Sequence, residues 1–365
     1  MKIILDKEIF LEKISLASKF TSNKLTSSNA LQGVMLKIEK KTIHFYASNL
    51  NSYFHTQLNY ESEKELKVVV DPRKIVEFLN LLSSGKIEID FKEKQIIIIF
   101  GKTKGSFPLI DFEDFPIAPI IEQNKEILEK KLLEKQLPLV LFSASSDESR
   151  PVLTGVNFIT DENDLLMVAT DGFRLSFSKT KKTTNFPSLI IPANILEDVI
   201  HLAKEEKNIS FAYSQKEKII VFVLGDKEIY SRLIEGDFPP YERVIPVELK
   251  TKIIIEKDEL LRNIKLASVF AKDFSNVVIF DVSEEGLRVR PKVDNGEDNT
   301  TFQEVEFEGE PQKIAFNYRF LIDFLNRISS KKLQIEILRS DAPVVFRLIG
   351  EANYLHIIMP VRIQE

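Results

Sequence analysis

The chain has 365 residues, of which 44% are hydrophobic and 29% charged, and its formal net charge at pH 7 is −5. This length exceeds what one hydrophobic core usually supports, so we expect two or three domains. The acidic balance argues against a protein that grips nucleic acid with its whole surface, although a duplex inside a locally basic channel is compatible with it. The absence of cysteine excludes disulfides, thiolate nucleophiles and cysteine-ligated zinc, and the longest aliphatic run is too short to span a membrane, so we expect a cytoplasmic protein.

The first third of the chain predicts a helix, then strands on both sides of a second helix. Phe10, Ile14 and Ala17 fall on one helical face behind a candidate N-cap, Asp6. A second helix is expected from Asp71-Pro72, because proline suits the first turn of a helix. Apolar runs and alternation predict strands over residues 33–39, 42–47, 54–58, 86–91, 95–102 and 107–110.

The same order of motifs returns along the chain. Leu16-Ala17-Ser18 recurs as Leu266-Ala267-Ser268, and a middle copy is marked by Asp114-Phe115-Pro116, which returns as Asp237-Phe238-Pro239. Each copy is predicted to open with a helix, with counterparts over residues 129–142 and 258–271, and second helices are expected near Pro192-Ala193 and Asn317-Tyr318. Prolines near residues 120 and 247 predict the boundaries of three repeated α+β domains, each with two helices and a β-sheet: residues 1–120, 121–247 and 248–365.

A strand, a turn and a second strand are expected around Asp171-Gly172. Residues 165–169 form an apolar run typical of a buried strand, and Phe173, Leu175 and Phe177 alternate with polar residues in the next one. Asp171 is the one acid in a special sequence context. We interpret it as a turn former whose side chain caps local backbone N–H groups, in preference to a catalytic acid.

The sequence offers no recognisable catalytic or metal-binding motif. Gly101-Lys102-Thr103 imitates the end of a phosphate-binding loop, but Ile96 stands where that loop requires glycine. The four histidines lie far apart in the chain and lack the spacing of metal ligands: His44, His55, His201 and His356. We therefore expect no catalytic residue, no metal and no cofactor.

Four separated segments, taken in order, resemble the bacterial DNA sliding clamp family, the beta subunits of DNA polymerase III: residues 147–156, 169–175, 235–246 and 357–362. The resemblance implies the DNA-clamp fold, in which two chains form a head-to-tail homodimeric ring with sheets outside and helices lining the hole. It also implies a processivity factor that catalyses nothing itself. Such a ring encircles duplex DNA without sequence preference and tethers the replicative polymerase alpha subunit, the clamp-loader delta subunit and other proteins that carry the clamp motif.

The resemblance assigns residues to three kinds of contact. An apolar pocket that accepts Leu and Phe side chains of a partner peptide, with two arginines to bond its carbonyls or carboxylates, is implied for Thr170, Gly172, Phe173, Arg174, Leu175, Pro239, Arg243, Val244, Asn317, Phe320, Val344, Met359, Pro360, Val361 and Arg362. Weak phosphate contacts are implied for Lys24, Arg73, Lys74 and Arg150, with Lys13, Lys131, Lys135, Lys204 and Lys265 as further candidates. The dimer interface is implied at Phe107, Leu109, Val269 and Phe270.

Alternatives stay open at this point. The interface residues read equally as ordinary core, and the chain is also compatible with a clamp-like paralogue that binds partners without encircling DNA, or with a hydrolase that uses Asp171. Two features depart from the family pattern: Phe173 stands where many relatives carry histidine or tyrosine, and Gln364-Glu365 extend the usual ending. The dimer affinity and the full set of partners do not follow from the sequence.

Overall fold

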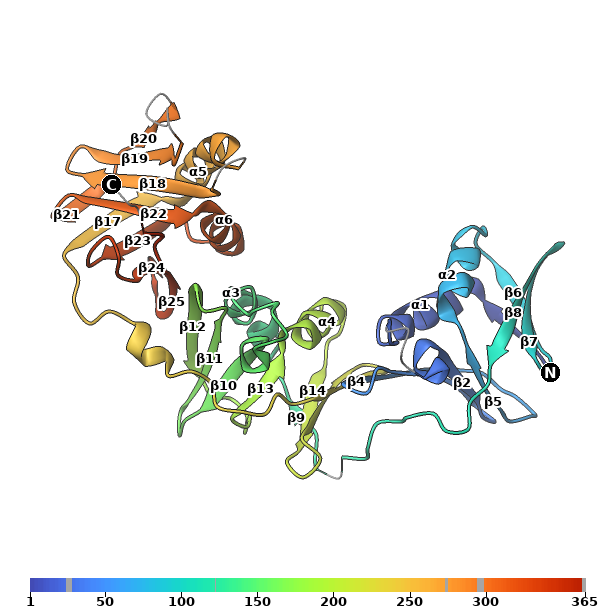
Figure 1. The fold of residues 1–365 in the computed structure, drawn as a ribbon. Helices are drawn as coiled ribbons and strands as arrows, with labels where there is room; N and C mark the ends of the chain where they lie inside the picture. The colour runs from blue at the N-terminus through green and yellow to red at the C-terminus, as the bar shows by residue number, and fades with distance from the viewer. Residues whose placement is uncertain (24–27, 122, 273–274, 294–298, 363–365) are drawn as a thin grey trace. The chain divides into compact units, whose positions relative to one another are not determined.

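Figure 1 shows the computed structural model of the chain, which describes residues 1–23, 28–121, 123–272, 275–293 and 299–362. One order of elements occurs three times: a strand, a helical segment, a group of strands, a second helix and three more strands. We call these copies repeats I, II and III. The threefold repetition predicted from the sequence is therefore present in the fold.

The elements of repeat I are β1 (Lys2–Asp6), α1 (Lys7–Ser18), η1 (Asn29–Gln32), β2 (Val34–Ile38), β3 (Thr42–Ser48), β4 (Ser52–Asn59), β5 (Leu66–Val70), α2 (Pro72–Asn80), β6 (Lys86–Phe91), β7 (Gln95–Phe100) and β8 (Thr103–Ile110). Those of repeat II are β9 (Glu126–Ile127), η2 (Leu132–Gln136), α3 (Pro138–Leu141), η3 (Pro151–Leu153), β10 (Gly155–Thr160), β11 (Asp164–Thr170), β12 (Arg174–Lys181), β13 (Leu189–Pro192), α4 (Ala193–Ala203), β14 (Ile209–Ser214), β15 (Ile219–Leu224) and β16 (Lys227–Arg232). The short turn η4 (Tyr241–Val244) precedes repeat III, whose elements are β17 (Thr251–Glu256), α5 (Lys257–Ala271), β18 (Val277–Ser283), β19 (Gly286–Pro291), β20 (Thr301–Gln303), β21 (Glu306–Gly309), β22 (Gln312–Asn317), α6 (Tyr318–Arg327), β23 (Lys332–Ile337), β24 (Val344–Leu348) and β25 (Glu351–Ile358).

Each repeat opens with a strand, where the sequence predicted a helix. In β1 the side chains of Ile3 and Leu5 are buried while their neighbours are exposed, the alternation of a strand with one covered face. β1 pairs with β6, β9 with β14 and β17 with β23. The prediction was wrong because these strands are short and run directly into the helical segment, whose apolar periodicity dominates the sequence pattern.

The helix predicted over residues 129–142 is interrupted. Pro138 has no backbone N–H and its ring obstructs the preceding turn, so a regular helix cannot continue through it. Before Pro138 the chain forms a wider, π-helical turn, η2. In it the Leu137 N–H donates to the Leu132 carbonyl, five residues back, over 2.8 Å. The α-helical turn of α3 then begins at Pro138.

The helix starts differ in how they are capped, and the one predicted cap, Asp6, does not form. Asp71 and Asn317 accept hydrogen bonds from the backbone N–H groups of Arg73 and Arg319, as expected of residues at the N-cap position. Asp6 occupies that position before α1, but its side chain makes no capping bond. Phe10, Ile14 and Ala17 are all buried on the inner face of α1, so that face was predicted correctly.

The strands of every repeat pair in one pattern, which gives two four-stranded sheets per repeat. In repeat I these are β5-β2-β3-β4 and β1-β6-β7-β8, and repeats II and III repeat both orders. The fourth strand of one repeat then pairs with the last strand of the next: β4 with β16, and β12 with β25. We call these two pairings the seams. They join sheets across the repeat boundaries. Together with the pairing of β5 with β8 inside repeat I and of β21 with β17 in repeat III, the joined sheets have 12 and 9 strands.

Close packing divides the chain into two compact units: residues 1–128 with 201–233, and residues 129–200 with 234–365. We call them the N-terminal and C-terminal units. The seams explain this division, because one sheet of repeat II continues the sheet of repeat I and the other continues the sheet of repeat III. The boundaries predicted near residues 120 and 247 fall in segments without helix or strand, and the exact domain limits stay a prediction.

Within the described residues, no helix is both long and apolar enough to cross a bilayer.

Candidate functional site

The turn between β11 and β12 is held by the side chain of Asp171. Its Oδ1 accepts hydrogen bonds from the backbone N–H groups of Phe173 (2.8 Å) and Arg174 (2.9 Å), and Thr170 Oγ1 accepts from the Gly172 N–H over 3.1 Å. Gly172 has φ +93°, a left-handed conformation that glycine adopts without strain. The interpretation of Asp171 as a turn former is therefore confirmed.

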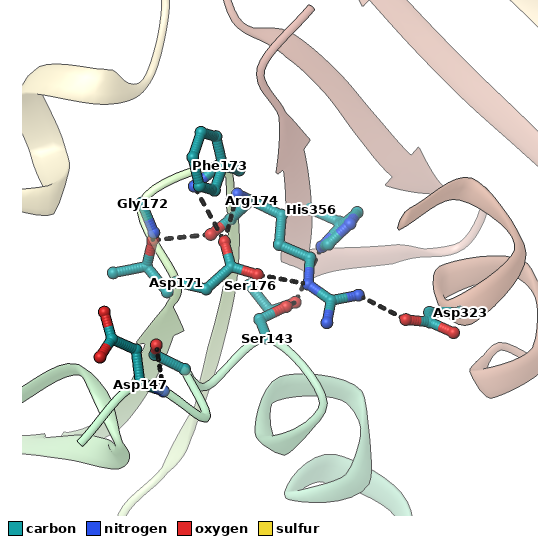
Figure 2. Close-up of polar contacts among 11 residues, drawn as sticks. Ser143, Asp147, Asp171, Gly172, Phe173, Arg174, Ser176, Asp323 and His356 are labelled. Carbon is teal, nitrogen blue, oxygen red and sulfur yellow. Dashed lines mark hydrogen bonds and ion pairs between the residues drawn. The ribbon is translucent and has the colours of Figure 1, made fainter. Parts of the chain in front are cut away.

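Arg174 joins this turn to helix α6 (Figure 2). Its Nε lies 3.0 Å from Asp171 Oδ2 and its Nη1 lies 2.9 Å from Asp323 Oδ2. The guanidinium carbon also lies 5.4 Å from the ring centroid of Phe142 and 4.9 Å from that of Phe320, within the range of cation–π attraction. With a side chain 12% exposed and two of its donors facing carboxylates, Arg174 serves mainly to tie repeat II to repeat III. Only the N–H groups of Arg174 that do not face these carboxylates are left to bond a peptide.

The exposed part of the site is aromatic. Phe173 at the tip of the turn is 59% exposed, and its ring lies nearly parallel to that of Phe320, with centroids 6.4 Å apart. The Phe173 carbonyl accepts a hydrogen bond from the Met359 N–H over 2.8 Å. The turn, the start of α6 and the C-terminal segment thus meet at one surface, as the resemblance implied.

A buried polar chain lies on the inner side of Arg174 (Figure 2). Ser143 Oγ and Ser176 Oγ are 2.7 Å apart, and Ser176 Oγ lies 2.8 Å from His356 Nδ1. His356 is fully buried, its ring stacks on Phe324 at 4.5 Å, and its Nε2 has no hydrogen-bond partner. Burial, and then the nearby charge of Arg174, hold the pKa of His356 well below its ordinary value of 6.5, so the ring is neutral at pH 7.

The remaining members of the predicted pocket divide by depth. Pro239, Arg243 and Arg362 are exposed, and Val244, Asn317, Met359 and Pro360 are partly buried. Leu175 and Val344, expected to line the pocket, are 3% and 0% exposed. Leu175 belongs to a buried cluster against which Val244 packs, so it supports the surface from below.

The C-terminal segment borders a cavity. The Val361 N–H donates to the Ala315 carbonyl over 2.8 Å, and the Val361 side chain packs against a small cluster on β18 and β22. Val361 and Arg362, together with Lys313 and Asp341, line a cavity of about 650 Å³. Gln364-Glu365 lie outside the described residues.

The residues expected to contact DNA differ in their surroundings. Arg73 and Lys74 are exposed on α2, and Arg150 is exposed with its Nε 3.3 Å from Asp147 Oδ2. Lys13 is 8% exposed and its Nζ lies 2.5 Å from Asp226 Oδ2, so its assignment as a DNA contact was wrong. The other helix lysines are exposed: Lys131, Lys135, Lys204 and Lys265. Lys24 lies outside the described residues.

The expected interface residues are also unequal. Val269 and Phe270 on α5 are 65% and 46% exposed, and no core function accounts for them. Phe107 is 9% exposed and packs edge-on against Phe78, with ring centroids 5.5 Å apart, while Leu109 is partly buried. Phe107 therefore fits the alternative of ordinary core.

Sequence reasoning missed Phe142, Asp323 and the Ser143–Ser176–His356 chain. These side chains meet only because α3, α6 and the seam between β12 and β25 converge, and no local motif marks them. Two of the histidines, separated in the sequence, are close in the structure. Pairing of β3 with β4 brings His44 and His55 together, with ring nitrogens 3.0 Å apart. Among the described residues, no group of three or more His, Asp or Glu side chains is arranged to hold a metal ion.

Comparisons with known proteins confirm the resemblance. Family models of the DNA polymerase III beta subunit match residues 1–119 with the N-terminal domain, 127–240 with the central domain and 242–362 with the C-terminal domain. The chain is 27% identical over 372 residues to the beta sliding clamp of Treponema pallidum and 25% identical over 382 residues to that of Halalkalibacterium halodurans. Each alignment covers 99% of this chain and 100% of the relative.

Solved structures agree with these matches. The DNA polymerase III beta subunit of Thermotoga maritima matches with a TM-score of 0.89 at 26% identity, over 100% of both chains. The DNA polymerase sliding clamp of Bacillus subtilis matches with a TM-score of 0.88 at 23% identity, again over 100% of both chains, which supports the fold alone. The predicted three-domain clamp fold is confirmed.

Proposed function

The chain belongs to the DNA polymerase III beta-subunit family and is a DNA sliding clamp, and on that basis we propose that two copies close head to tail into a ring around duplex DNA. Such a ring acts through topology, because a closed ring slides along DNA without dissociating. A polymerase bound to it stays near the primer end at high effective concentration. The chain itself catalyses nothing.

The observation that carries the ring is the repeated seam. In both seams the fourth strand of one repeat pairs with the last strand of the next. Within the described residues, the fourth strand of repeat III, β20, has no such counterpart, and Thr103–Phe107 of β8 have a strand partner on one side only, β7. Exposed strand edges of this kind call for a partner. In a head-to-tail dimer, β20 of each copy pairs with β8 of the other copy. These two further seams close the ring.

An apolar surface beside the open edge of repeat III supports this pairing. Leu266, Val269 and Phe270 on α5 are 50%, 65% and 46% exposed, and Phe302 on β20 is 48% exposed. Exposed apolar side chains gathered at one open edge are typical of an interface that is buried on association. We therefore assign Val269 and Phe270 to direct contact between the subunits. We assign buried Phe107 to the packing that supports the interface from below.

We assign DNA contact to exposed cations on the helices, with Arg73 and Lys74 on α2 and Lys265 on α5 as the main candidates, together with Arg150. Single cations on helices give weak phosphate contacts that carry no sequence information, which is what sliding requires. The net charge of −5 limits non-specific binding of DNA to the rest of the surface.

We assign the binding of partner peptides to the surface formed by Phe173, Phe320, Val244 and Met359. A groove of this composition accepts Leu and Phe side chains of a short extended segment, at roughly micromolar affinity because the peptide must be ordered on binding. The replicative polymerase and the clamp loader are the expected carriers of such segments. Asp171 is engaged by two backbone N–H groups and by Arg174, which leaves it no role as a hydrolytic base.

The experiment compares retention on closed circular and linearised DNA. We expect the wild-type protein to stay on circular DNA in high salt and to be lost on linearisation, because charge contacts weaken with ionic strength and a topological link does not. Phe270→Glu should give folded monomers that are not retained. Ile349→Glu, at an equally exposed site (46%) on the β24–β25 hairpin, is the matched control and should remain a dimer.

The sedimentation coefficient of each variant distinguishes the alternatives. A wild-type dimer that leaves circular and linear DNA at the same rate would contradict encirclement and favour a clamp-like paralogue. A Phe270→Glu protein that still sediments as a dimer would contradict the interface assignment.

A further inference from the structure

A row of four ionisable side chains crosses the sheet of the N-terminal unit from the end of β2 to β16. Glu39 Oε2 lies 3.6 Å from His44 Nε2, His44 Nδ1 lies 3.0 Å from His55 Nε2, and His55 Nδ1 lies 3.1 Å from Glu228 Oε2. His55 on β4 and Glu228 on β16 stand directly opposite each other in the first seam. A carboxylate therefore flanks each end of a histidine pair, and the row runs across the strands that join repeat I to repeat II.

The hydrogen positions in this row follow from its geometry. Glu228 is a carboxylate, because hydrogen bonds from His55, Tyr230 and Lys125 outweigh its burial and lower its pKa to about 2. His55 Nδ1 must then carry hydrogen to donate to it. If the pair holds no extra proton, His44 Nδ1 has to donate to His55 Nε2, and the lone pair of His44 Nε2 then faces the Glu39 carboxylate.

One added proton removes this conflict. With hydrogen on both nitrogens of His55, that ring donates to Glu228 and to His44, and His44 is free to donate to Glu39. Every contact in the row then joins a donor to an acceptor, and the positive charge lies between two carboxylates. A second proton would set N–H against N–H across 3.0 Å. In agreement, burial and the charge of His55 lower the pKa of His44.

A metal ion does not fit in the place of the proton. The ring centroids of the two histidines are 5.2 Å apart and the facing nitrogens 3.0 Å apart, so the nitrogens lie close to the line that joins the rings. A zinc ion on that line needs about 2.0–2.1 Å to each nitrogen, which would require the nitrogens to be about 4 Å apart.

Other charged groups face the row from each neighbouring element. Lys37 on β2 pairs with Glu39 and lies near Glu65. Tyr46 on β3 stacks on His55. Glu228 is contacted by Tyr230 on β16 and by Lys125, which directly precedes β9. Burial raises the pKa values of both tyrosines, so they stay neutral near pH 7. The histidine pair is thus the only part of this neighbourhood expected to change charge near neutral pH.

We propose that His44 and His55 share one bound proton that fastens the β4–β16 seam, so that the junction of repeats I and II is strongest in a pH window around neutrality and loosens on either side of it. Tyr46, His55, Glu228 and the linker over residues 116–121 line a cavity of about 320 Å³ beside the seam, which gives water a route to the pair. The two histidines titrate as a coupled unit.

The direction of the effect follows from counting protons. Above the ordinary histidine pKa of 6.5, the unfolded chain holds no proton on these rings while the folded pair holds one, so stability is lost as pH rises through the first step of the pair. Below 6.5 the unfolded rings hold two protons and the folded pair still holds one, so stability is lost as pH falls towards the second step.

The first test is an NMR titration of the full-length protein with labelled histidine. The chain has four histidines, so His44→Gln, His55→Gln and His201→Asn assign the signals. Exposed His201 serves as the reference. We expect the pair to titrate in two steps, one above and one below the ordinary histidine value of 6.5, separated by at least one pH unit, a tenfold difference in proton affinity. Titration of both rings in one step near pH 6.5 would overturn the proposal.

The second test measures the seam itself by hydrogen exchange of the β16 amides, corrected for the intrinsic pH dependence of exchange. We expect protection in the wild type to be highest near pH 6.5, to fall by up to about tenfold for each pH unit between 6.5 and either step, and to level off beyond that step. Glu228→Gln keeps a hydrogen-bonding group of the same size but removes the charge, and should flatten the profile. An identical profile in wild type and Glu228→Gln would overturn the link between the proton and the seam. If Glu228→Gln does not fold, the profile in wild type decides, because protection that shows no maximum contradicts the proposal.

Discussion

Replacing Arg174 with methionine should destabilise the C-terminal unit far more than removing Asp323, its other carboxylate partner. Methionine keeps most of the length and packing of the arginine side chain, so the change removes charge and hydrogen bonds and leaves little cavity. The two ion pairs differ in exposure: the Arg174 and Asp171 side chains are 12% and 15% exposed, whereas that of Asp323 is 52% exposed.

These exposures set the magnitudes. The hydrogen-bonded pair with Asp171 contributes roughly 1.5–3 kcal/mol, as expected of a charged hydrogen bond shielded from water. The two cation–π contacts add about 0.5–1 kcal/mol each. The half-exposed pair with Asp323 contributes at most about 1 kcal/mol. Arg174→Met should therefore cost about 3–5 kcal/mol and Asp323→Asn less than about 1 kcal/mol.

Urea unfolding followed by circular dichroism measures both variants, with midpoints compared at a common slope. The position of Phe173 also depends on this turn, so Arg174→Met should weaken the binding of a clamp-motif peptide. Asp323→Asn should change peptide affinity by no more than about fivefold, the equivalent of an exposed ion pair worth less than about 1 kcal/mol. Equal losses of stability in the two variants would refute the reasoning, because the shielded pair with Asp171 would then contribute nothing beyond the exposed one.

Three further predictions concern buried groups and backbone geometry. Because His356 is neutral in the folded protein, stability should fall as pH drops below 6.5, where the unfolded chain takes up a proton. In His356→Leu this dependence should shrink by up to about 1.4 kcal/mol per pH unit, and unchanged unfolding midpoints between pH 5 and 7 would contradict it. Lys13→Met should lower stability by about 1–3 kcal/mol, since it leaves Asp226 without its closest partner, yet retain circular DNA as well as wild type does; a loss of DNA retention in the folded variant would return Lys13 to the DNA surface. Gly172→Ala should weaken peptide binding and leave the dimer intact, because φ +93° strains alanine by roughly 1 kcal/mol and the turn carries Phe173; calorimetric titration that shows undiminished affinity would contradict this.

The sequence predicted the elements well where the local pattern was long and periodic. The inner face of α1, the helix starts near Asp71-Pro72 and Asn317-Tyr318 and the Asp171 turn all follow from residues close together in the chain, and all are present. The short strand β1 was missed because five residues of alternation merge into the helix that follows. The break before Pro138 was missed because the apolar spacing on either side of it is still helical.

The site was harder to predict than the fold. Motif position identified the Phe173 turn and the C-terminal segment as parts of the site. It did not tell which side chains are buried, so Leu175 and Val344 were predicted to line the pocket although they are buried. Depth depends on how the two sheets pack, which no single segment encodes. The same holds for the Arg174–Asp323 pair and for the contact between His44 and His55, each of which joins different elements of the fold.

The two seams also set the order in which the protein can be completed during synthesis. β4 ends at Asn59 and its partner begins at Lys227, and β12 ends at Lys181 and its partner begins at Glu351. At ribosomal rates of roughly 5–20 residues per second, each of these strands waits on the order of ten to thirty seconds for its partner to emerge. During that interval the edge is open to other nascent chains. Polar side chains occupy both edges, with His55 and Gln57 on β4 and Lys179 and Lys181 on β12. Polar and charged side chains on an edge strand disfavour pairing with strands of other chains. These residues therefore protect the open edges from aggregation until the partner strand of the same chain has been synthesised.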